Sequence, residues 1–269
     1  MKIMNYLSEL ENKTIYIIRE AYSRFRNISL LWSIGKDSTA MLWIARKAFF
    51  GKIPFPVMHI DTNYKFKEIY EFRDKYAKIW GLNLLISRNN SAIESGMGPE
   101  VNKFKCCNAL KTIALKDTIK KYNLKALLLA IRRDEHGIRA KERYFSPRDL
   151  NFKWDYQNQP AELWNLYKAG LNSDEHLRVH PMLHWREIDI WRYIAQEKIP
   201  VTPLYFAKNN LRYRSIGCET CCMPVKSNAN TIKKIVRELE TTKTAERSGR
   251  AQDKEDTYTM QKLRSLGYM

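Results

Sequence analysis

One short segment constrains the fold of this 269-residue chain more than any other: residues 29–39, which read SLLWSIGKDST. It begins as an apolar run, passes through a small polar loop around Gly35, and ends where a helical pattern of apolar residues starts at Met41. A strand, a tight turn and a helix N-terminus in this order direct backbone N–H groups and the positive end of the helix dipole at one point. The segment therefore predicts a site for phosphate or pyrophosphate, to which Lys36 adds a full charge.

Two common phosphate-binding loops do not fit this segment. A Walker loop has a glycine where this chain has Leu30, and a serine or threonine directly after the lysine, where this chain has Asp37. The dinucleotide-binding motif requires three spaced glycines, and only Gly35 is present. An ordinary strand-to-helix turn without a ligand is the remaining alternative.

The loop resembles the pyrophosphate loop of the adenine nucleotide α-hydrolase superfamily, Ser-Gly-Gly-Lys-Asp-Ser, with Ile34 in place of the first glycine. Members of that superfamily cleave ATP between its α and β phosphates and hold the leaving pyrophosphate in this loop. The resemblance implies ATP as the cofactor and a set of binding residues: Ser33, Ile34, Gly35, Lys36, Asp37 and Ser38. Because a branched side chain disfavours positive φ, we predict that Gly35 alone supplies any left-handed turn here.

Composition indicates a globular protein, with 44% hydrophobic and 28% charged residues. No apolar run approaches the roughly 20 residues that cross a bilayer, and the N-terminus lacks a signal-peptide core, so we expect a cytoplasmic protein. The net charge of +18 predicts anionic ligands such as nucleotides, sulfate, RNA or an acidic partner protein. Its spread along the chain favours a basic cleft over a nucleic-acid-binding arm, without excluding nucleic acid.

Apolar runs alternate with helical patterns along the first 200 residues. Strands are expected at about 28–32, 56–60, 83–87, 126–131 and 178–182, and helices at about 1–27, 37–50, 66–80, 107–122 and 186–197. Continuous apolar strands are typical of a parallel sheet that is covered on both faces. We therefore predict an α/β fold with a parallel twisted sheet of about five strands and helices on both faces. Residues 1–200 form the pyrophosphate-loop domain, and residues 201–269 form a charged, cysteine-containing C-terminal extension.

Two stretches interrupt this pattern. The polar residues 88–103 are expected to form a mobile loop, and residues 136–176 a long ordered excursion without periodicity.

Polar clusters follow three of the predicted strands, at residues 33–38, 61–62 and 132–135. Ligands of parallel sheets bind at the carboxyl ends of the strands, so we expect these clusters to meet at one edge of the sheet.

A basic cluster directly follows the strand predicted at 126–131. The arginine side chain is well matched to phosphate and sulfate, because its planar fork donates paired hydrogen bonds. The candidates for binding sulfate and the α-phosphate are Arg132, Arg133, Arg139, Lys141 and Arg143. The alternative is a salt-bridged surface helix in which Asp134, Glu135 and Glu142 pair with these cations.

Several segments occur in the order found in the small-subunit family of bacterial sulfate adenylyltransferases, within the phosphoadenylylsulfate reductase group. The resemblance covers about residues 10–269 and rests on residues 54–56, 59–62, 71–74, 134–135, 139–143, 160–164, 185–191 and 246–250. It implies adenylyl transfer from ATP to sulfate, with a GTPase large subunit as partner. It also implies pyrophosphate and Mg²⁺ at the loop, where Lys36 and Asp37 act, and adenine and ribose beside His59, Asp61 and Thr62.

The five cysteines fall into two clusters, Cys106 with Cys107, and Cys218 with Cys221 and Cys222. In a cytosolic protein such clusters favour a metal or redox site over structural disulfides. They resemble the cysteines of assimilatory adenylylsulfate reductases, which implies a [4Fe–4S] cluster, or Zn²⁺, on Cys106, Cys107, Cys218 and Cys221. Free thiols are the alternative. No cysteine follows Cys222, so the additional nucleophilic cysteine of those reductases is missing.

Two other functions stay open on the sequence. One is an Fe–S-containing reductase acting on adenylyl sulfate or phosphoadenylyl sulfate. The other is an ATP-dependent sulfurtransferase that acts on tRNA or another acceptor.

Overall fold

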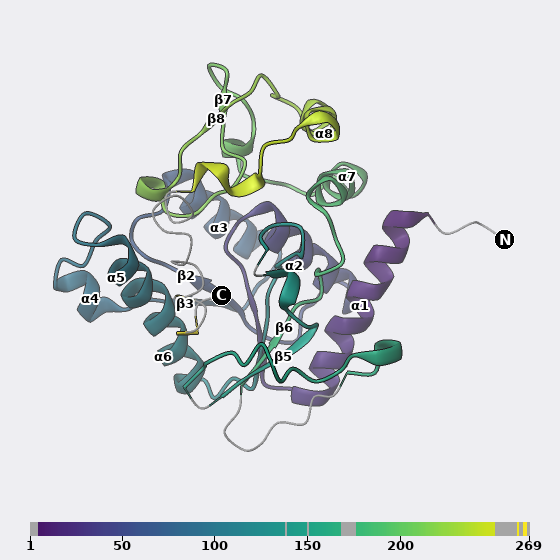
Figure 1. Ribbon diagram of the computed structural model, residues 1–269, viewed down its shortest axis with the longest axis vertical. Coiled ribbons are helices and arrows are strands. Elements are labelled where there is room, and N and C mark those ends of the chain that lie inside the picture. The colour runs from purple at the N-terminus through teal and green to yellow at the C-terminus, as the bar shows by residue number, and fades with distance from the viewer. Residues whose placement is uncertain are drawn as a thin grey trace.

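The computed structural model describes residues 5–137, 139–149, 151–167, 176–250, 263 and 266–267. Within these residues, no helix is both long enough and apolar enough to cross a membrane. A six-stranded sheet forms the centre of the molecule (Figure 1). Its strands are β1 (Ile28–Leu31), β2 (Val57–Ile60), β3 (Leu84–Ser87), β4 (Ala126–Leu128), β5 (Phe145–Arg148) and β6 (His176–Val179).

The strands are arranged in the order β3-β2-β1-β4-β6-β5. All neighbours are parallel except β5, which runs antiparallel to β6 at one edge. The order reverses between β1 and β4, and ligands of doubly wound folds bind at such a point. The α/β prediction is confirmed, with one strand more than expected. The additional strand β5 contains Pro147, which a sheet tolerates at its edge.

Burial explains why the apolar runs became strands. Every residue of β1, β2, β4 and β6 is buried, as expected for parallel strands covered on both faces. The edge strand β3 is only partly buried. The predicted strand at 126–131 is shorter in the structure, because regular pairing in β4 ends at Leu128.

Helices surround the sheet and connect its strands (Figure 1). They are α1 (Tyr6–Phe25), α2 (Lys36–Ala48), α3 (Lys67–Ile79), α4 (Asn90–Glu94), α5 (Lys103–Cys107), α6 (Ala114–Lys121), α7 (Glu187–Glu197) and α8 (Ile232–Thr241). Helix α2 packs against α1 and α7, while α4, α5 and α6 gather on the other side of the view.

Two sequence predictions change in detail. The stretch predicted as a mobile loop contains α4. The helix predicted at 107–122 consists of α5, a π-helical segment over Asn108–Ile113, and α6.

The C-terminal extension lies above the sheet in Figure 1 over residues 201–250. It contains a short hairpin of β7 (Leu211–Arg212) and β8 (Val225–Lys226), helix α8, and 3₁₀ turns at Pro203–Tyr205, Glu219–Cys221 and Glu246–Gly249. Helix α8 packs against α7, which joins the extension to the rest of the molecule. The domain boundary at residue 200 stays a prediction.

Candidate functional site

A pocket lies at the point where the strand order reverses. Its walls include residues of the loop after β1, residues 129–131 after β4, and residues 215–217 of the extension. The predicted meeting of the first and third strand ends is therefore present in the structure, and the extension forms a further wall.

The loop backbone differs from the sequence prediction. Ile34 has a φ of 65°, in the left-handed region, whereas Gly35 has an extended backbone with φ −71° and ψ 161°. The prediction that Gly35 alone supplies the left-handed turn is therefore wrong. The Ile34 side chain is 1% exposed within the main hydrophobic core, and this burial holds a backbone conformation that a branched residue otherwise avoids.

Small polar groups line the loop. The hydroxyls of Ser33 and Ser38 lie 3.0 Å apart, and that of Ser38 donates to the Gly35 carbonyl at 3.1 Å. A Cβ added to Gly35 would come within 3.3 Å of Ser33 Oγ and 3.5 Å of the Tyr205 hydroxyl. The missing side chain therefore leaves room beside these hydroxyls, at the N-terminus of α2.

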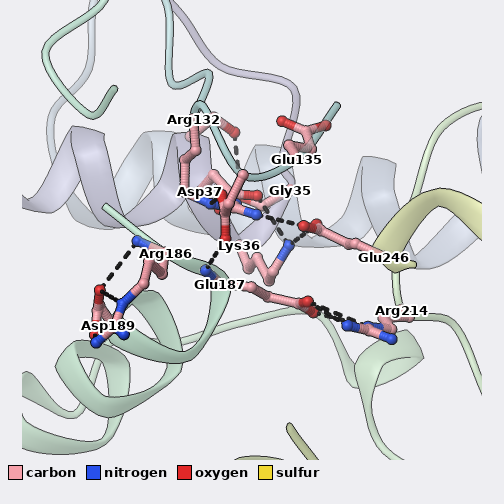
Figure 2. A network of polar contacts seen from close by, with 12 residues as sticks. Gly35, Lys36, Asp37, Arg132, Glu135, Arg186, Glu187, Asp189, Arg214 and Glu246 are labelled. Carbon is pink, nitrogen blue, oxygen red and sulfur yellow. Dashed lines mark hydrogen bonds and ion pairs between the residues drawn. The ribbon is translucent and has the colours of Figure 1, made fainter. Parts of the chain in front are cut away.

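Lys36 begins α2 and is buried. Its Nζ contacts Asp37 at 3.0 Å and also contacts Glu246 of the extension (Figure 2). Burial by itself lowers the pKa of Lys36. The carboxylates of Asp37 and Glu246 outweigh this effect, so the pKa is raised overall and the side chain stays charged. The backbone N–H of Lys36 donates to the Tyr205 hydroxyl at 2.8 Å.

Arg132 shares both carboxylate partners with Lys36. Its guanidinium is fully buried and contacts Asp37 and Glu246 (Figure 2). Its Nε donates to Asp134 at 2.9 Å. Burial raises the pKa of Glu246, but the charges of Arg132 and Lys36 have the larger combined effect and lower it below its usual range. Two cations and two carboxylates therefore form one network, of which Lys36, Asp37 and Glu246 line the pocket and Arg132 does not.

Only some of the basic residues predicted to bind sulfate or phosphate line the pocket. Arg139 lines the pocket and pairs with Glu135. Arg133 stacks over the Tyr144 ring and Lys141 over the Tyr156 ring, at 5.1 and 5.5 Å, so neither lines the pocket. Arg143 does not line it either, and its carbonyl contacts the His180 ring at 2.8 Å.

The residues at the end of β2 have mainly internal partners. His59 Nδ1 contacts the Trp32 carbonyl at 2.9 Å, and burial lowers the pKa of His59 to about 4. The buried Asp61 accepts hydrogen bonds from Asn63, Tyr70 and Arg88. Thr62 lies 3.2 Å from the sulfur of Cys218. None of the three lines the pocket; Ile60 and Lys65 of the same stretch do.

A group of cations that the sequence analysis missed lines another part of the pocket: Lys65, Lys111, Arg247 and Arg250. They come from three segments that are distant in the sequence, so no local pattern indicates that the segments meet. Burial raises the pKa of Cys218, but Lys111 and Lys65, with the Thr62 hydroxyl and Arg250, lower it to about 6. Lys65, Lys111 and Arg250 therefore place Cys218 in a positive environment.

The cysteines of the two clusters come into one neighbourhood. All five are buried, and none of them forms a disulfide. Burial raises the pKa of Cys106 to about 12, and Cys107, Cys218 and Cys221 add to the shift, which places the two clusters within electrostatic reach of each other. Among the described residues, however, no group of three or more histidine, cysteine, aspartate or glutamate side chains is arranged to hold a metal ion. The predicted cluster stays a prediction.

Comparison with known proteins identifies a family that the chain matches and several similar proteins. Residues 27–224 match the family model described as phosphoadenosine phosphosulfate reductase domain. The chain is 42% identical to sulfate adenylyltransferase subunit 2 of Parabacteroides distasonis, over 98% of each protein. It is 40% identical to the protein of the same name from Colwellia psychrerythraea, over 98% of this chain and 99% of that one.

Solved structures with low sequence identity share the fold. Yeast FAD synthetase in complex with FAD is 19% identical, with a TM-score of 0.56 over 93% of each chain. Phosphoadenylyl-sulfate reductase from Candida auris is 15% identical, with a TM-score of 0.54 over 84% of this chain and 98% of that one. FMN adenylyltransferase from Candida glabrata, in complex with ATP, has a TM-score of 0.57 at 19% identity over 81% of this chain, which spans 63% of that structure.

Proposed function

The chain belongs to the phosphoadenosine phosphosulfate reductase domain family and, within it, to the sulfate adenylyltransferase subunit 2 proteins, and from this premise we propose that it transfers the adenylyl group of ATP to sulfate. The products are adenylyl sulfate and pyrophosphate. The observation that carries the proposal is the similarity over nearly the whole chain to relatives of that name. The pocket supports it, because it has a phosphate-type loop and a separate group of cations.

The loop holds the pyrophosphate part of ATP in this proposal. The N-terminus of α2 offers backbone N–H groups, Ser33 and Ser38 offer hydroxyls, and Lys36 offers a permanent charge. Mg²⁺ suits the loop, since it binds through one or two carboxylates together with substrate phosphates, and Asp37 is the carboxylate that the loop itself contributes to the pocket wall. When bound, the ion neutralises charge on the pyrophosphate oxygens.

Sulfate binds near Lys65, Lys111 and Arg250, which line the same pocket as the loop. One sulfate oxygen attacks the α-phosphorus and forms the new P–O bond. The bond between the α-phosphorus and the bridging oxygen breaks, and its electron pair leaves with pyrophosphate. No side-chain nucleophile is needed, so the protein contributes positioning and neutralisation of the developing charge.

The partner in this proposal is the GTPase large subunit, and the reaction takes place in the cytoplasm. The name subunit 2 of the relatives supports a second subunit. The experiment measures pyrophosphate release from ATP and sulfate by the chain with this partner and GTP. Release that depends on sulfate supports the proposal, whereas release with tRNA and none with sulfate contradicts it.

Two variants separate the roles of the loop and of the cation group. Lys36→Met should lower turnover by about 10²–10³-fold, the usual effect of removing one donor to developing charge. Lys111→Met should raise the KM for sulfate more than the KM for ATP. Lys47→Met is the matched control, because Lys47 pairs with Glu11 and Glu197 on the surface. Equal effects of Lys111→Met on both KM values would contradict the sulfate assignment.

The [4Fe–4S] cluster or Zn²⁺ on Cys106, Cys107, Cys218 and Cys221 is a separate proposal. Among the described residues, no three or more potential ligands are arranged to hold a metal ion. Iron, zinc and sulfide analysis of anaerobically purified protein decides it.

A further inference from the structure

The C-terminal extension places a carboxylate on the phosphate-type loop. Glu246 opens the 3₁₀ turn Glu246–Gly249, and its side chain is 6% exposed. One carboxylate oxygen contacts Lys36 Nζ and the other contacts Arg132 Nη2 (Figure 2). Both oxygens of Glu246 therefore pair with cations that lie at the loop or directly beside it.

A second side chain of the extension, Tyr205, accepts a hydrogen bond from a backbone N–H group of the loop. The Tyr205 hydroxyl accepts a hydrogen bond from the Lys36 N–H, which lies in the first turn of α2. The first N–H groups of a helix are the ones that bind phosphate. The extension thus engages both the charged Nζ and the backbone N–H of Lys36, two donors of the same site.

Contacts on both sides of Glu246 hold it over the loop, and none of them involves the loop. Arg214 donates to the Thr244 carbonyl at 2.6 Å, and Arg247 contacts Glu135 at 3.1 Å. The Met223 N–H donates to the Gly249 carbonyl at 2.9 Å. These contacts do not depend on the Glu246 carboxylate, so they would keep the extension attached if that carboxylate left the two cations.

We propose that Glu246 is a built-in phosphate mimic, which pairs with Lys36 and Arg132 in the empty protein and is displaced by the pyrophosphate group of ATP. A carboxylate and a phosphate repel each other and compete for the same donors, so nucleotide binding must overcome the Glu246 contacts. The inference rests on the proposed function, because it takes the loop as the pyrophosphate site. It adds that Glu246 competes with pyrophosphate for Lys36 and Arg132.

Calorimetric titration with inorganic pyrophosphate tests this competition. Glu246→Gln removes the competing charge and should bind pyrophosphate about tenfold more tightly than the wild type. Glu238→Gln is the matched control, since Glu238 pairs with Arg212 in the same extension, away from the loop. Unchanged or weaker binding by Glu246→Gln overturns the proposal, because Glu246 then only positions the two cations.

A second measurement uses the wild-type protein and so does not depend on the folding of a variant. Hydrogen exchange of the amides in residues 246–249 should become faster when pyrophosphate is added, and slower or unchanged exchange overturns the proposal. Lys36→Met separates the assignment of the loop as the pyrophosphate site from the competing role of Glu246. If it binds pyrophosphate as tightly as the wild type, or if the wild type does not bind at all, the assignment of the loop fails first.

Discussion

Ile34 shows how burial overrides local backbone preference. A left-handed backbone at a non-glycine residue costs on the order of 1–3 kcal/mol, and complete burial of an isoleucine side chain contributes about as much in the opposite direction. The side chain is 1% exposed, so the two effects are of similar size. The superfamily motif has glycine at this position, which was the available signal for a positive φ.

Two substitutions at position 34 measure this balance. Glycine is usually less stable than alanine by about 0.5–1 kcal/mol within regular structure. Here φ is 65°, so Ile34→Gly should be more stable than Ile34→Ala by roughly 1 kcal/mol, although both lose the buried side chain. Urea unfolding of the pair gives the difference. A more stable Ile34→Ala would show that the backbone at this position is not left-handed in solution.

At the scale of elements, the region predicted as one helix at 107–122 positions Lys111. The π-helical segment Asn108–Ile113 separates α5 from α6, and Lys111 lies within it. A π-helix adds residues to a turn and so changes which side chains share a face. Apolar periodicity predicts that a helix forms here, but it does not predict that Lys111 lines the pocket.

Helix α7 is attached to the extension by a buried ion pair. Arg214 contacts Glu187 through Nη2 at 2.6 Å, and the two side chains are 9% and 8% exposed. Burial raises the pKa of Glu187, and the nearby charge of Glu246 adds to this rise. The charge of Arg214 therefore offsets the repulsion between the neighbouring carboxylates of Glu187 and Glu246.

Removing Arg214 should be costly, because it leaves the Glu187 carboxylate buried without this partner. Arg214→Met should lower the free energy of unfolding by about 3–5 kcal/mol, and adding Glu187→Gln should recover part of the loss. Arg24→Met, which breaks the exposed pair with Glu20, should cost about 0.5 kcal/mol or less. Similar losses for Arg214→Met and Arg24→Met in denaturant titrations would contradict this view.

At the scale of the whole molecule, buried histidines make stability depend on pH. Burial lowers the pKa of His59 and His184 to about 4 and that of His176 to about 3. In the unfolded chain these groups titrate near 6.5. As the pH falls below about 6.5, the unfolded chain therefore binds protons that the folded chain does not, and stability decreases until the folded values are reached.

The expected slope can be measured between about pH 6 and pH 5, above the usual range of carboxylates. Three protons correspond to at most about 4 kcal/mol per pH unit. His184→Gln should reduce the slope of the unfolding free energy against pH by up to the contribution of one proton. A wild-type stability that is flat across this range would contradict the burial of the three imidazoles in the neutral form.

Local patterns predicted much of the fold and part of the site. The apolar runs of β1, β2, β3, β4 and β6, and the loop around Lys36, are visible in the sequence because burial and turn chemistry act over a few residues. Strand β5 was missed, since an edge strand needs no continuous apolar run. Arg133, Lys141 and Arg143 look equivalent to Arg132 in sequence, and only the path of the chain after β4 separates them.

The sequence by itself determined the class of fold, the place of the phosphate-type loop and, through its resemblance to a family, the chemistry proposed for it. Only the tertiary structure decided which charges meet. Glu246 lies 210 residues from Lys36, and Lys65, Lys111 and Arg250 come from three separate segments. Side chains from such distant positions come together only when the sheet, α7 and the extension have packed. Because charge pairing in a buried site depends on distance and desolvation, no local pattern can contain it.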